Sequence, residues 1–119
     1  MESAIIVFTK TPYGHINFIE AARVAQGLRV LDKEVACVFL DDAVYGLLKR
    51  QDTSGIGMHS VKPVLTYLKS SEIDIYVVKD SLGERGLDIS MIDEEYGVKS
   101  ISFEDFSALQ EKFDTTIFF

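Results

Sequence analysis

Cysteine, proline and tryptophan are scarce in this chain of 119 residues, which contains one cysteine, two prolines and no tryptophan. A single cysteine cannot form an internal disulfide, and with only two histidines it cannot complete a cysteine-rich zinc site. These absences favour an intracellular protein. No motif in the sequence requires a metal ion or another cofactor, so we expect none.

Positive charge is also in short supply. The chain has 12 Lys and Arg against 19 Asp and Glu, a formal net charge of -7, whereas nucleic acids and anionic lipids attract clustered basic residues. No apolar run approaches the roughly 20 residues of a membrane span, and the segment Met1 to Ala4 leads into a strand without a basic signal region. We predict a cytoplasmic protein that binds neither nucleic acid nor membranes directly.

Apolar residues are plentiful: they make up 47% of the chain, including eight Phe and five Tyr, and are enough to build a real core. The length suits one domain and is too short for two independent ones. We therefore expect a single domain over residues 1–119. No repeat or linker interrupts it.

The apolar residues fall into short continuous runs separated by stretches with helical spacing. Continuous rather than alternating runs indicate strands of a parallel sheet that is covered on both faces. We predict strands at 4–8, 35–40, 73–78, 98–101 and 115–119, with helices that begin near Asn17, span Ala43 to Lys49 and Val61 to Ser70, lie within 79–87, and begin at Ser102. This order predicts an α/β fold, a three-layer α/β/α sandwich with a mostly parallel, flavodoxin-like five-stranded sheet.

Several polar residues stand where helices are expected to start or stop. Asp41 and Asp42 precede the helix at 43–49, Asp80 is the second residue of the segment 79–87, and Ser102 with Asp105 resembles a capping box. We interpret the three acidic residues as helix caps. The alternative is a magnesium-binding receiver site, which needs carboxylates from several strand ends, but the first strand ends without an acid.

In an open parallel sheet, ligands bind at the carboxyl ends of the strands. Three loops there qualify: 9–15, 41–44 and 79–86. The first lacks both GxGxxG and GxxxxGK[ST], so a phosphate site is a minor alternative to a plain turn. His15 could act as an acid or base, or be surface structure. The segment from Gln51 to Ser60 has no periodicity and is predicted to be a mobile loop. Candidate pocket or interface residues are Tyr13, Gly14, His15, Asp42 and Gln51.

Cys37 has three strand residues on either side, so we expect its thiol to be buried. Apolar surroundings raise the pKa of a thiol and suppress the reactive thiolate. A nucleophilic cysteine would sit at a strand end beside a helix N-terminus. The segment Lys79 to Ser81 is that place here, and it holds no cysteine. We therefore assign Cys37 to the core and predict no catalytic residue.

Three segments together resemble the TusC/DsrF branch of the DsrE-like sulfur-relay superfamily. They are the turn Thr11-Pro12-Tyr13-Gly14 after the first strand, the stretch from Val38 to Gln51 with its Asp-Asp-Ala-Val-Tyr-Gly-Leu-Leu core, and Ser81-Leu82-Gly83-Glu84-Arg85-Gly86-Leu87-Asp88. Each motif is modest alone, but their order and spacing extend over nearly the whole chain. The resemblance implies a DsrE-like fold.

The resemblance also implies a function. Proteins of this kind are subunits of hetero-oligomers with DsrE/TusD-like and DsrH/TusB-like partners, and they pass persulfide sulfur to tRNA thiolation or to sulfur oxidation. The relay cysteine of the superfamily belongs at the end of the third strand, where this chain has Val78. The corresponding relay-site loop would consist of Val78, Lys79, Asp80, Ser81, Glu84 and Arg85.

We therefore expect a structural or docking subunit of a sulfur-relay complex, more a noncatalytic subunit than an enzyme. Two alternatives stay open. One is a flavodoxin-like module that binds a small ligand or nucleotide through the loop at 9–15. The other is a carrier in which Cys37 is exposed after all.

Overall fold

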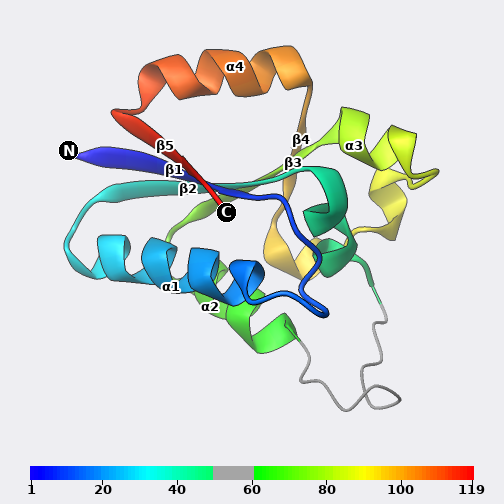
Figure 1. Cartoon of the computed structure of the whole chain (residues 1–119), viewed down its shortest axis with the longest axis horizontal. Helices are drawn as coiled ribbons and strands as arrows, with labels where there is room; N and C mark the ends of the chain where they lie inside the picture. The colour runs from blue at the N-terminus through cyan, green and yellow to red at the C-terminus, as the bar shows by residue number, and fades with distance from the viewer. Residues whose placement is uncertain (50–60) are drawn as a thin grey trace.

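The computed structural model describes residues 1–49 and 61–119, and shows a five-stranded sheet with helices on both faces (Figure 1). All four strand pairings are parallel, and the strand order is β4-β3-β2-β1-β5. The loop predicted at 51–60, with Gln51, lies outside the described residues. The strands are β1 Ser3–Phe8, β2 Glu34–Phe39, β3 Asp74–Val78, β4 Lys99–Ile101 and β5 Thr115–Phe118.

Two helical layers enclose the sheet. Among the helices of the described ranges, α1 and α2 lie against one face and α4 lies against the other (Figure 1). The predicted three-layer α/β/α class is confirmed. The α-helices are α1 Asn17–Val30, α2 Lys62–Ser70, α3 Lys79–Glu84 and α4 Phe103–Lys112, and the 3-10 helices are η1 Asp41–Leu47, η3 Ile89–Met91 and η4 Glu94–Tyr96.

The two faces of the sheet have separate cores. On the α1 and α2 face, Phe8 stacks on Phe39 with ring centroids 4.3 Å apart, and Phe18 meets Phe8 edge-on at 5.0 Å. Cys37 lies on this face and is 0% exposed, as predicted. The other core is smaller, and from the helices it buries only Phe106; the strand and loop residues in it are Ile5, Val7, Val38, Leu40 and Val78.

The strand order creates a topological switch point between β3 and β4. Strands β1 to β4 follow one another toward one edge, and the chain then returns through α4 to place β5 beside β1. After β3 the chain contributes Leu82 of α3 and Tyr96 of η4 to the core on the α1 and α2 face, whereas after β4 it contributes Phe106 of α4 to the opposite core. The loops after β3 and β4 therefore leave the sheet on opposite faces, which is where α/β folds place their sites.

Three helices end with the same hydrogen-bond pattern. After α3, the N–H of Gly86 donates to Gly83 and the N–H of Leu87 donates to Leu82, which is a Schellman motif. Gly86 has a φ of +66°, the left-handed conformation that glycine adopts readily at this position. The same pattern closes α1 and α2, but there the left-handed position holds Asp32 at a φ of 60° and Glu72 at 64°.

The starts of the helices agree less well with the sequence. Ser102 and Asp105 form the predicted capping box, with the Asp105 N–H 3.0 Å from the Ser102 hydroxyl. The prediction that Asp41 and Asp42 cap the next helix was wrong, because η1 begins at Asp41 itself and no side-chain hydrogen bond caps it. Helix α1 begins at Asn17, as predicted, and no side chain caps it.

Candidate functional site

The loops on the two sides of the switch point are joined by one hydrogen bond. The backbone N–H of Phe103, the first residue of α4, donates to Oδ1 of Asp80 at 3.2 Å. Asp80 therefore satisfies the start of α4, because the first N–H groups of a helix have no partner within it. Its predicted role as a cap of α3 was wrong, since no side chain caps that helix. The hydrogen bond holds the ends of β3 and β4 together.

Val78 is the last residue of β3, at the position where the resemblance expects a relay cysteine. Its side chain is 0% exposed and belongs to the core shared with Phe106. A valine offers neither a nucleophile nor a polar group. At this strand end the chain therefore has a packed aliphatic group instead of a thiol.

Ser81 connects the loop after β3 to the loop after β2. Its hydroxyl is buried and accepts a hydrogen bond of 2.9 Å from the backbone N–H of Asp41. Asp41 has a φ of 51°, a left-handed conformation that non-glycine residues seldom adopt. The Ser81 hydroxyl accepts a hydrogen bond from the Asp41 N–H in this conformation. This hydrogen bond fixes η1 and α3 to one another.

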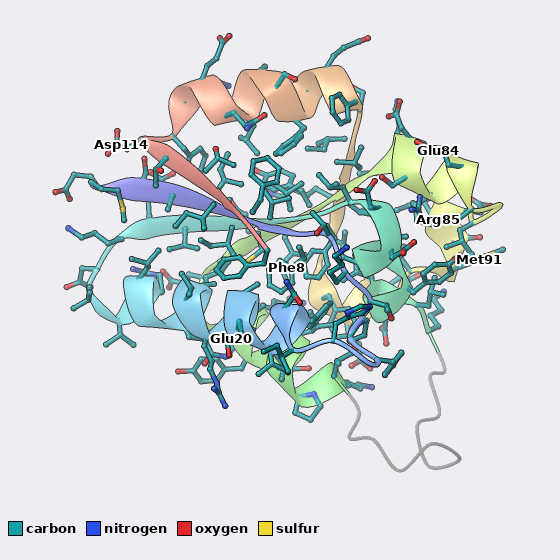
Figure 2. All side chains as sticks on the ribbon, in the orientation of Figure 1. Phe8, Glu20, Glu84, Arg85, Met91 and Asp114 are labelled. Carbon is teal, nitrogen blue, oxygen red and sulfur yellow. The ribbon has the colours of Figure 1, made fainter. Side chains whose placement is uncertain are left out.

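Arg85 reinforces the same junction (Figure 2). Its Nε and Nη2 both lie 3.0 Å from Oδ1 of Asp42, and its Nη1 donates to the Ser81 carbonyl at 3.1 Å. The Arg85 side chain is 19% exposed but that of Asp42 is 59% exposed, so solvent screens this ion pair and its main role is to fix the geometry of the two loops. The structure thus brings Ser81, Arg85 and Asp42 together as one network. Lys79 and Glu84, the other predicted loop residues, are exposed.

The loop after β1 approaches both η1 and η4. Tyr13 is half-buried, and burial raises its pKa. Tyr96 of η4 has its pKa raised to about 12, first by burial and then by the nearby charges of Asp93 and Glu95 and by Tyr13. The loop therefore lies beside η4, while Asp42 joins the loop after β3. Gly14, with a φ of 83°, and His15 are both exposed.

One close approach gave no signal in the sequence. A Cβ at Gly46 of η1 would lie 2.8 Å from Cε2 of Phe18 and 3.4 Å from Cγ of Pro12. Phe18 is itself fully buried in the aromatic cluster and cannot move aside easily. Gly46 thus lets η1 press against the start of α1. A lone glycine in an apolar stretch does not reveal such a contact.

Metal and thiol chemistry find little support in the described ranges. Within residues 1–49 and 61–119, no three His, Cys, Asp or Glu side chains are grouped so as to hold a metal ion. Burial raises the pKa of the Cys37 thiol far above its ordinary value, so the thiolate does not form at neutral pH. In the same ranges, no helix is both long and apolar enough to cross a membrane.

These features define a class: an open parallel α/β domain whose strand-end loops are fixed by hydrogen bonds and an ion pair, without a thiol among them. The model of the DsrE/DsrF-like family matches residues 2–119. The chain belongs to the DsrE/DsrF-like family.

Individual relatives agree with this assignment. The chain is 40% identical over 109 residues to the intracellular sulfur oxidation protein DsrF of Allochromatium vinosum, a match that covers 91% of this chain and 75% of that protein. The crystal structure of the ychN protein from E. coli superimposes with a TM-score of 0.83 at 21% identity over the full length of both chains. A protein of unknown function from Methanobacterium thermoautotrophicum gives a TM-score of 0.71 at 14% identity, covering 99% of each chain. The two structural matches show the shared fold.

Proposed function

We propose that this chain is a DsrF-like subunit of an intracellular sulfur-relay complex, and that it docks partner subunits without carrying sulfur itself. The relative named for intracellular sulfur oxidation aligns with 91% of the chain. The proposed partners are DsrE/TusD-like and DsrH/TusB-like proteins. A relay needs carriers with reactive thiols and also a scaffold that holds them in reach of one another, and we assign the second role to this chain.

The observation that carries the docking role is the strand end at Val78. The side chain there is aliphatic and 0% exposed, and the only cysteine of the chain, Cys37, is equally buried on the opposite side of the sheet. Persulfide transfer requires a thiolate that a second thiol or persulfide can reach. Neither position meets that requirement, which supports a subunit that acts through its surface.

The Ser81, Arg85 and Asp42 network suits a docking subunit. A preformed loop loses little conformational entropy when a partner binds, so ordering the loop does not reduce the binding free energy. Here the Arg85 guanidinium ties two loops that are 43 residues apart in the chain. The exposed side chains of Lys79 and Glu84 stand on this fixed base. The nucleotide-binding alternative is not favoured, because the matched relative is a sulfur oxidation protein.

A sulfur-loading experiment tests the noncarrier role. The purified native protein would be incubated with polysulfide and examined by intact-protein mass spectrometry. We expect no added sulfur on the wild type, while Lys79→Cys, which places a thiol at the exposed start of α3, gains sulfur. Cys37→Ala serves as the control for any background at the buried thiol. Sulfur on the wild type that disappears in Cys37→Ala would show that the chain is a carrier.

A second experiment tests the docking role. The chain would be purified from its own cells through an N-terminal tag, and the assembly measured by native mass spectrometry. We expect masses that contain DsrE-like and DsrH-like chains, and we expect Arg85→Ala to reduce their recovery because the two loops lose their tie. Arg23→Ala, an exposed arginine in the middle of α1, is the matched control. Recovery of this chain only with itself would rule out the heteromeric form.

A further inference from the structure

The outer side of β5 is an open sheet edge. Strand β5 pairs with β1 on one side, and within the described ranges no strand pairs with its other side. In Figure 1, β5 lies in front of β1 and no helix passes over it. An open edge presents unpaired backbone N–H and C=O groups, which are a template for another strand.

The hydrogen bonds to β1 show which groups are open. Phe119 donates its N–H to Val7 and accepts from the N–H of Thr9, so both of its backbone groups face β1. Backbone direction alternates along a strand. The N–H and C=O groups of Thr116 and Phe118 therefore face outward, and they form two identical pairs of donor and acceptor separated by one residue.

Strand β5 also lacks the features that normally protect an edge. From Thr115 to Phe119 it has no charged side chain and no proline, and Phe118 is 56% exposed. The opposite edge, β4, is three residues long and begins with Lys99, whose ammonium lies 3.5 Å from Asp74 and over the Tyr76 ring. Short length and lysine are standard protection against edge pairing. Only β5 is left free to pair.

We propose that β5 binds the β5 strand of a second copy of this chain in antiparallel register, which makes one continuous sheet across two subunits. A two-fold axis beside Ile117 sets Thr116 opposite Phe118 of the other copy. Each such pair exchanges two N–H to C=O bonds, so the dimer satisfies all four outward groups on each strand. Two copies of the strand can pair with each other because the two-fold axis exchanges the two outward residues, Thr116 and Phe118.

The side chains fit the same register. Thr116 and Phe118 lie on the α4 face, where Phe118 already meets Phe106 edge-on at 6.5 Å. Pairing would cover the exposed Phe118 ring with Thr116 of the other copy, and it would bring the two Ile117 side chains together on the opposite face. The side chains from Thr115 to Phe119 carry no charge, so no like-charged side chains of this segment oppose one another in the register. This surface is separate from the proposed relay function.

A charge-swap experiment tests the register. Sedimentation of the purified protein over a range of concentrations would measure dimerisation, and hydrogen exchange would measure protection of the Thr116 and Phe118 amides. We expect a wild-type dimer in which both amides gain protection as concentration rises. The double variant T116E/F118E sets like charges opposite one another, whereas T116K/F118E sets opposite charges there. We expect dimerisation of T116E/F118E to be at least about tenfold weaker than that of T116K/F118E.

The controls separate pairing from folding. Both double variants lose the same Phe118 ring, so comparable melting temperatures at low concentration show that the subunit itself is unaffected. Ser100→Glu adds a charge to the other edge strand and should leave dimerisation unchanged. A wild-type chain that stays monomeric, unprotected amides in a dimer, or equal dimerisation of the two charge variants would overturn the proposal. None of these readouts depends on sulfur transfer.

Discussion

At the residue scale, Tyr96 makes stability depend on alkaline pH. Burial and the charges of Asp93 and Glu95 raise its pKa from 10.0 to about 12 in the folded protein. The unfolded chain therefore loses this proton first as pH rises, and between these two values the unfolded state binds fewer protons than the folded state. We expect the protonated Tyr96 hydroxyl to contribute fully to the free energy of unfolding below pH 10. This contribution is lost as pH rises toward 12. Urea unfolding across this range measures the decline.

Tyr96→Phe provides the matched control for that decline. The variant keeps the ring and removes the ionisable hydroxyl, so its unfolding midpoint should fall less steeply over the same pH range. The other four tyrosines of the chain remain and account for any shared baseline. An identical slope in the variant would show that Tyr96 does not cause the pH dependence.

Gly46 gives a second prediction at this scale. Its replacement by alanine forces a Cβ against the buried Phe18 ring. We expect Gly46→Ala to lower the free energy of unfolding by about 1–3 kcal/mol, which is typical of overpacking. Denaturant melts measure this loss.

Gly27 is the matched control, because it is exposed in α1 and a Cβ there meets nothing within 4 Å. Gly27→Ala should raise the free energy of unfolding by about 0.5–1 kcal/mol through helix propensity alone. If Gly46→Ala were as stable as the wild type, the close approach of η1 to α1 would not constrain the fold.

Individual residues were predicted well where a local rule decides their environment. The burial of Cys37 followed from the apolar residues beside it in the strand and is confirmed. The roles of Asp42 and Asp80 were missed because their partners, Arg85 and Phe103, are 43 and 23 residues away. An acidic residue after a strand has the same local signature whether it caps its own helix or pairs with a distant group.

At the scale of elements, the ends of α1 and α2 store a conformational cost. Asp32 and Glu72 occupy the left-handed position that Gly86 fills after α3. Side chains are disfavoured there by contact between Cβ and the backbone. We expect Asp32→Gly to raise the free energy of unfolding by about 0.5–1 kcal/mol, the gain in the folded state being partly offset by the greater freedom of glycine in the unfolded chain.

The reverse substitution serves as its counterpart. Gly86→Ala puts a side chain into the same conformation after α3 and should cost about 1 kcal/mol, although a Cβ there meets no atom within 4 Å. Thermal melts of the two variants measure both effects. A loss of stability in Asp32→Gly would mean that the Asp32 side chain contributes more than its conformation costs.

The sequence predicted most elements because each follows a strong local pattern. The buried strands β1, β2 and β3 coincide with continuous apolar runs to within a residue, since both of their faces are covered. The capping box of α4 is equally local. The segment after β2 began two residues earlier than expected, because Asp41 adopts a left-handed turn that is stabilised from outside by Ser81.

At the scale of the whole molecule, the two helical layers are held unequally. Helix α4 buries only Phe106 against its face of the sheet, whereas α1 buries Phe18 and three alanines in the larger core. We expect Phe106→Ala to cost about 3–5 kcal/mol and to speed hydrogen exchange in α4 far more than in β1 and β2, because α4 then opens as a local unit.

Exchange measured by mass spectrometry on proteolytic fragments gives this comparison. Leu65→Ala, a buried change in α2, is the control that weakens the opposite layer. Its effect should appear in α2 and in the strands under it. Equal acceleration in both layers after Phe106→Ala would show that the sheet unfolds as one unit.

The sequence indicated the fold class but not the strand order. Alternating strands and helices predict a parallel three-layer sandwich in general. The flavodoxin order is 2-1-3-4-5, whereas here the last strand returns to lie beside the first. That return requires α4 to cross the face of the sheet opposite α1 and α2. No local sequence pattern indicates which face a helix covers. The switch point and the open β5 edge follow from that order, so neither could be located beforehand.

The parallel pairing of β1 with β5 has a practical consequence for labelling. Met1 lies at the amino ends of the strands, while Phe119 lies at their carboxyl ends, hydrogen-bonded to Thr9 (Figure 1). A fluorophore or fusion partner attached at Phe119 would therefore stand beside both the strand-end loops and the β5 edge. The same group attached at Met1 would leave both surfaces clear, so the position of the tag alone could decide whether an assembly is observed.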